Sequence, residues 1–109
     1  MQKKAMSKKE QAMVRQRSVR EKLPNGQIYE YVPLGKHVVS APGVCRGRPT
    51  FKYTRIEVAG VLRWLCAGNS IDKLIAGYGG RVTLEALQEA GVLAARALMR
   101  QASGQGNAQ

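Results

Sequence analysis

The sequence is short of the residues that build catalytic and metal sites. It holds one His, two Cys and seven scattered acidic residues, with no CxxC pair. A metal site needs several ligands at fixed spacing, and a catalytic site needs a nucleophile, a base and a stabilising group in one cleft. No glycine-rich nucleotide-binding motif follows a predicted strand either. We therefore expect no metal, no cofactor and no enzyme.

Long apolar runs are also missing. The most apolar segment, residues 92–99, is interrupted by Arg96 and is far too short to cross a membrane. The N-terminus has lysines but no apolar stretch behind them, so it does not look like a secretory signal. We expect a cytoplasmic protein that binds no membrane and keeps Cys45 and Cys66 as buried free thiols.

Positive charge is in excess. The chain has 18 Lys and Arg against 7 Asp and Glu, which gives a net charge of +11. Residues 1–22 hold eight Lys and Arg with two Glu, and residues 23–55 hold five with one Glu, whereas residues 56–109 come to +1. Such a field favours contact with a polyanion, most often nucleic acid. Solubility alone is the alternative.

The length suits one domain. Residues 1–23 lack Gly and Pro and have few apolar positions, so we expect a basic arm that is disordered or becomes helical on a partner. Residues 24–102 are the expected folded domain, and residues 103–109 a polar tail. A turn at residues 24–26 and strand-like residues at 28–32 and 37–40 predict a short β-hairpin. Tyr29 and Tyr31 would pack on the helices rather than stack on bases.

Three helices are expected after the hairpin. An apolar stripe at Val58, Val61, Leu62 and Leu65 predicts a helix that ends near residue 67. Ser70 and Thr83 suit the start of two further helices, the last reaching about Gln101. The predicted fold is mostly α: a helix-turn-helix-like three-helix domain, preceded by the hairpin and the basic arm.

The predicted nucleic-acid contacts come mainly from the arm and from a Gly- and Pro-punctuated loop. Arginine forks in this loop suit phosphate oxygens, and a glutamine early in the last helix is a candidate base contact. The set is Lys8, Lys9, Arg15, Arg17, Arg46, Arg48, Lys52, Arg55 and Gln88.

The last helix is apolar around most of its circumference and acidic at its start, through Glu85 and Glu89. These acids would repel phosphates, and so large an apolar surface predicts a subunit interface. The alternative is a central helix wrapped by the other elements. The predicted interface is Trp64, Leu87, Gly91, Leu93, Ala94 and Leu98.

Several motifs follow one another in a fixed order. They are residues 42–49 (PGVCRGRP), Thr54-Arg55-Ile56, Leu62-Arg63-Trp64-Leu65, Ala67-Gly68, Ser70-Ile71, Tyr78 and Thr83-Leu84-Glu85. Over about residues 37–100 this order resembles the domain of unknown function 433 family. The resemblance implies a helix-turn-helix-like domain and a VapB-type antitoxin, which silences a PIN-like ribonuclease and represses its own operon. Tyr53 stands where the family has glycine, and a tyrosine adopts a positive φ only at a cost.

These observations predict a DNA-binding antitoxin-like protein or small transcriptional regulator that forms a homodimer or higher assembly. Its expected partners are double-stranded DNA, a second copy and a PIN-like ribonuclease toxin. The alternative is a protein–protein assembly module whose basic arm binds nucleic acid without sequence preference.

Overall fold

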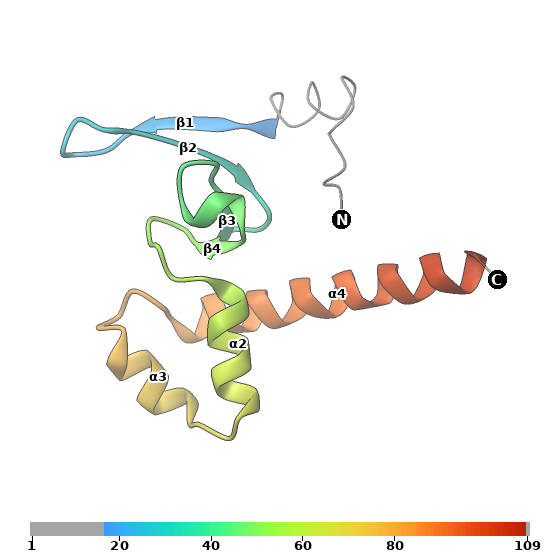
Figure 1. Cartoon of the computed structure of the whole chain (residues 1–109). Helices are drawn as coiled ribbons and strands as arrows, with labels where there is room; N and C mark the ends of the chain where they lie inside the picture. Colours follow the sequence, from blue (N-terminus) through green and yellow to red (C-terminus); the bar gives the residue numbers. More distant parts are fainter. Residues whose placement is uncertain (1–16, 109) are drawn as a thin grey trace.

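The fold pairs a small antiparallel sheet with three helices (Figure 1). The computed structural model describes the backbone of residues 17–108 and the side chains of residues 17–103. The strands pair in sequence order, β1-β2-β3-β4. The elements are β1 (Val19–Lys22), β2 (Ile28–Pro33), β3 (Val38–Ser40), the 3-10 turn η1 (Cys45–Gly47), β4 (Thr50–Phe51), α2 (Val58–Cys66), α3 (Ile71–Gly77) and α4 (Leu84–Ala108).

The prediction of a mostly α fold is wrong, because a four-stranded sheet stands where a single hairpin was expected. Two strands lie outside the predicted hairpin: the two-residue strand β4, and β1, which lies inside the segment assigned to the basic arm. The side chains of β1 alternate between half-buried and exposed, but three of the four are charged, which hides the pattern in the sequence. The rest of the predicted arm, residues 1–16, lies outside the described residues.

The turn at residues 24–26 forms as expected and joins β1 to β2. The Gly26 N–H donates to the Leu23 carbonyl oxygen at 2.8 Å, and Gly26 adopts a φ of 87°. The expected hairpin is also present, as the pairing of β2 with β3, where Val32 faces Ser40. The two pairings share β2, so the segment is a meander rather than one hairpin.

The apolar residues form two buried clusters rather than one core. The larger joins β3 and β4 to the three helices, through residues such as Phe51, Val61 and Leu74. The smaller lies on the sheet and contains Tyr29 and Tyr31 with Val39 and Ala41. Both tyrosines are buried, as expected, but in the sheet cluster and not against the helices.

The three helices begin where the sequence predicts. Ser70 Oγ accepts from the Lys73 N–H at 3.0 Å, and Thr83 Oγ1 accepts from the Ala86 N–H at 3.1 Å. These bonds satisfy amide groups that a helix start leaves without a partner. Helix α4 continues past Gln101 to Ala108 and projects beyond α2 and α3 (Figure 1). Within the described chain no helix is long and apolar enough to cross a membrane.

Candidate nucleic-acid interface

The loop between β3 and β4 is built around three successive residues in the left-handed region. Cys45, Arg46 and Gly47 have φ values of 49°, 57° and 80°. This conformation costs energy for any residue with a Cβ. Two hydrogen bonds hold the turn. The Ser40 hydroxyl donates to the Gly47 carbonyl oxygen at 2.7 Å, and the Gly47 N–H donates to the Val44 carbonyl oxygen at 3.0 Å. The fixed turn presents the Arg46 side chain to solvent.

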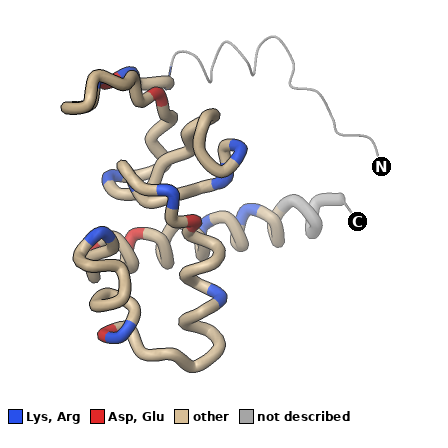
Figure 2. Tube along the Cα trace, turned by 60° about the vertical axis from the view of Figure 1, so that its left-hand side comes forward, with Lys and Arg blue, Asp and Glu red and all other residues tan. Residues whose placement is uncertain are grey.

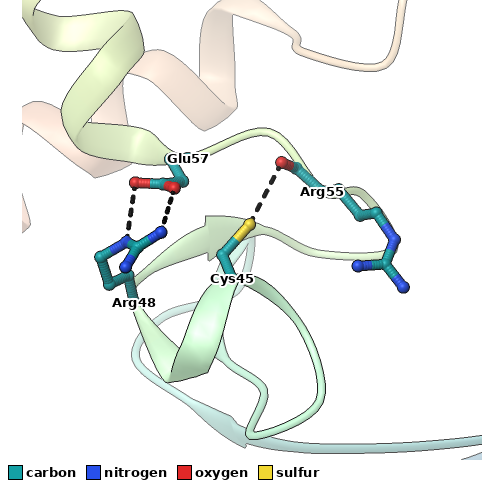
Figure 3. Close-up of polar contacts among 4 residues, drawn as sticks. All are labelled: Cys45, Arg48, Arg55 and Glu57. Carbon is teal, nitrogen blue, oxygen red and sulfur yellow. Dashed lines mark hydrogen bonds and ion pairs between the residues drawn. The ribbon is translucent and has the colours of Figure 1, made fainter.

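Arg48 ties this loop to the start of α2. Its Nε and Nη2 donate to the two carboxylate oxygens of Glu57 at 3.1 Å and 2.8 Å (Figure 3). Glu57 is the residue that precedes the first turn of α2. Hydrogen bonding to Glu57 raises the pKa of Arg48, and the same contact is the main reason that the pKa of Glu57 is lowered. Arg48 therefore positions the loop.

Arg55 lies across the same loop. Its carbonyl oxygen accepts from Cys45 Sγ at 3.5 Å, and its guanidinium points away from the Arg48–Glu57 pair (Figure 3). Arg55 and Arg63 both line an open depression of about 430 Å³ beside Gly60 and Tyr78. Arg63 was missing from the predicted contacts. It is exposed on the side of α2 away from the predicted apolar stripe, which is the signal that would have found it.

We call Arg46, Arg48, Arg55 and Arg63 the arginine cluster. Three of the four were predicted to bind phosphate. Glu57 pairs with Arg48 and lines the same depression as Arg55 and Arg63. Arg63 adds, more weakly than Arg48, to the lowering of the pKa of Glu57. Only the charge of Arg48 is matched by that carboxylate at ion-pair distance within residues 17–103. Exposed guanidinium groups with spare donors suit the oxygens of a phosphate backbone.

Lys52 takes part in a different contact from the one expected. Its Nζ lies 3.8 Å from Glu21 Oε1, and 5.0 Å and 5.1 Å from the ring centres of Tyr31 and Tyr53. Glu21 also accepts hydrogen bonds from both tyrosine hydroxyls. The bond from Tyr31, then that from Tyr53, lowers the pKa of Glu21. Lys52 thus helps fasten β1 to the loop after β4.

Tyr53 adopts a backbone conformation that favours glycine, with a φ of 67°. Its N–H donates to the Tyr29 hydroxyl at 3.0 Å, and the two rings lie 5.3 Å apart. Its own hydroxyl donates to Glu21 at 2.8 Å. These contacts offset the cost of the left-handed backbone at Tyr53.

Five predicted contacts remain. Lys8, Lys9 and Arg15 lie outside the described residues. Arg17 lines a groove between α2 and α4, and Gln88 is exposed on α4. Neither Arg17 nor Gln88 joins the arginine cluster.

Glu89 was expected to repel phosphate as a free acid at the start of α4, but its carboxylate is hydrogen-bonded. Its carboxylate accepts hydrogen bonds from the backbone N–H groups of Lys36, His37 and Val38, at 2.9, 2.6 and 3.0 Å. Within this first part of α4, Glu85 is left as the exposed acid. The repulsion of phosphate by the start of α4 is therefore smaller than the sequence suggests.

The predicted interface residues divide between core and surface. Leu87 is 6% exposed and belongs to the main core, and Leu93 packs partly against that core. Trp64, Gly91, Ala94 and Leu98 are exposed. The cysteines are free, but Cys45 is half-buried and Cys66 exposed, so the expectation of buried thiols is wrong.

Comparison with protein families gives one result. A family model described as "Protein of unknown function (DUF433)" matches residues 38–94. The chain belongs to this family. The match runs from β3 into α4, so the arginine cluster lies within the family's range and the β1–β2 hairpin outside it. None of the curated proteins and none of the solved structures compared with the chain is similar to it.

Proposed function

We propose that this member of the family binds double-stranded DNA through the arginine cluster and acts as a small antitoxin-like regulator. The observation that carries the proposal is the set of arginines on the η1 loop, the segment before α2 and α2 itself. Arg48 pairs with Glu57, Arg55 and Arg63 line one depression with that residue, and Arg46 is exposed on the neighbouring turn. The loop backbone is held by hydrogen bonds, so little ordering is needed on binding.

The surrounding charge supports the same partner. Residues 17–55 carry eight Lys and Arg against two Glu, and Figure 2 shows these positions spread over the sheet and its loops. A field of this sign raises the rate of encounter with a polyanion and supplies the affinity that does not depend on sequence.

Specific regulation is tested with two duplexes. Fluorescence anisotropy would compare the protein's own upstream DNA with a scrambled duplex of equal length at two salt concentrations. A regulator should bind the upstream duplex at least about tenfold more tightly at the higher salt. Equal affinity would leave DNA binding without sequence preference and remove the regulator.

The groove between α2 and α4 favours a second candidate function, the binding of a PIN-like ribonuclease. The groove has a volume of about 580 Å³, and Leu34, Leu62 and Leu93 contribute to its apolar surface. Three arginines also line it: Arg17, Arg96 and Arg100. This arrangement fits an apolar segment with acidic neighbours, and binding there would silence the enzyme.

The second candidate is tested with a purified PIN-like ribonuclease encoded beside this chain. The chain should inhibit the enzyme in proportion to its amount, and Leu62→Glu should remove the inhibition because it places a charge in the groove. Arg46→Ala should leave inhibition unchanged. Inhibition that survives Leu62→Glu in a folded variant would exclude the groove.

A further inference from the structure

Helix α4 has a second apolar side that no other part of the described chain covers. Its inward side supplies Ala86, Leu87 and Ala90 to the main core. Its outward side carries a regular series of exposed residues, Leu84, Gln88, Gly91, Ala95, Leu98 and Ala102. We call this series the α4 seam.

The spacing of the α4 seam is that of a coiled coil. Its members are separated by 4, 3, 4, 3 and 4 residues, an average close to the 3.5 that keeps one stripe facing a partner helix. Leu84 and Leu98 are 49% and 66% exposed, and Val92 and Met99, which flank the seam, are 51% and 69% exposed. Such exposure of large apolar side chains on one helix marks an interaction surface.

Charge separates this surface from the rest of the helix. Helix α4 contains four charged residues, Glu85, Glu89, Arg96 and Arg100, and none of them is a member of the seam. The Glu89 carboxylate already accepts hydrogen bonds from the backbone N–H groups of residues 36–38. An uncharged stripe with two small residues at its centre fits another helix at close approach.

We propose that the α4 seam binds the same seam of a second copy of this chain, with the two helices antiparallel about residue 93. In this register Leu84 faces the partner's Ala102, Gln88 faces the partner's Leu98, and Gly91 faces the partner's Ala95. Each outer layer pairs a large side chain with a smaller one, so the layers fill evenly. A parallel pair would put Leu98 on Leu98 and Gly91 on Gly91, which leaves a gap at the centre.

Electrostatics favour the same orientation. The basic sheet lies near the first turns of α4, while the end of the helix projects away from it (Figure 1). An antiparallel pair separates the two basic sheets, whereas a parallel pair would bring them together.

The inference deepens the proposed function by naming the surface through which two copies join. It does not depend on the arginine cluster, so the two proposals can fail separately. A seam of about 27 Å is short, and we expect a dissociation constant on the order of micromolar.

The test compares two alanines on opposite sides of α4. Ala95→Glu puts a carboxylate against the partner's Gly91 in both central layers of the seam, whereas Ala97→Glu makes the same change on the groove side. Sedimentation at several concentrations should show a dimer for the unchanged chain and for Ala97→Glu. Ala95→Glu should dimerise at least about tenfold more weakly. Both alanines are exposed, and circular dichroism checks that both variants fold.

Orientation is tested by disulfide trapping in a background with Cys45 and Cys66 changed to Ser. A mixture of Leu84→Cys and Ala102→Cys chains should cross-link to each other, and neither should cross-link efficiently to itself. A monomer at about 100 µM, far above the expected dissociation constant, would overturn the proposal. So would equal weakening by Ala97→Glu or efficient self-cross-linking of Leu84→Cys. DNA binding measured in parallel shows whether only the assembly has failed.

Discussion

The contact between Glu89 and the turn before β3 is open to a double-mutant test. The Glu89 carboxylate accepts from three consecutive backbone N–H groups, and those of His37 and Val38 are partly buried. A hydrogen bond to a charged group contributes about 1.5–3 kcal/mol, and less where water can replace the acceptor. Glu89→Ala should therefore lower the free energy of unfolding by about 2–4 kcal/mol.

Gly35 supplies the second half of the test. A Cβ at this position would lie 2.5 Å from Glu89 Oε1 and 2.7 Å from its Cδ, so the carboxylate would have to move. We expect Gly35→Ala to cost about 1–2 kcal/mol in the unchanged chain, through weakened hydrogen bonds. With Glu89→Ala the clash is gone, and Gly35→Ala should be neutral or stabilising by about 0.5 kcal/mol.

Urea unfolding followed by circular dichroism measures all four proteins of this cycle. The expected coupling between the two sites is about 1–2 kcal/mol. Glu85→Ala, one turn earlier on α4 and exposed, is the matched control and should change stability by less than about 0.5 kcal/mol. Additive effects, or a neutral Gly35→Ala in the unchanged chain, would refute the reasoning.

Three further predictions concern the sheet and its loops. Thr50 Oγ1 is fully buried and has no hydrogen-bond partner among the described residues. Thr50→Val should therefore raise the free energy of unfolding by about 1 kcal/mol. A lower free energy of unfolding in urea would contradict this. The hydrogen bond from Arg48 lowers the pKa of Glu57. The stability that the ionised Glu57 carboxylate contributes is therefore present above pH ~4.5 and is lost as the pH falls further. Glu57→Gln should then flatten the fall of the urea midpoint between pH 5 and pH 3; an unchanged fall would exclude this pair as a cause. Tyr53→Gly relieves the left-handed backbone but removes the bond to Glu21 and the packing on Tyr29, so it should lower Tm; a higher Tm would show that strain dominates.

The sequence carries clear signals for the helices and for the turn at residues 24–26. Capping at Ser70 and Thr83 and the apolar stripe of α2 act within a few residues, so local patterns reveal them. Strand β1 depends on distant partners. Its Glu21 is held by Tyr31, Tyr53 and Lys52, and a charged segment looks like an arm until those partners are known.

The candidate site was only partly predictable for the same reason. Residues 46–55 form one basic loop in the sequence, and the structure divides their roles. Arg48 pairs with Glu57, and Lys52 pairs with Glu21 of the β1–β2 hairpin. Arg63, on α2, lines one depression with Arg55. Side-chain pairing across nine or more residues decides these roles, and charge counting does not detect it.

The most direct test of the account is the salt dependence of DNA affinity. Each phosphate contact contributes about 0.9 to the slope of log K against log salt concentration. Arg46→Ala combined with Arg55→Ala should reduce that slope by about 2, as the loss of two contacts requires. Arg96→Ala combined with Arg100→Ala removes the same charge from α4 and should leave the slope within about 0.5 of its original value. An unchanged slope in a folded Arg46→Ala, Arg55→Ala variant would contradict the claim that the arginine cluster binds DNA.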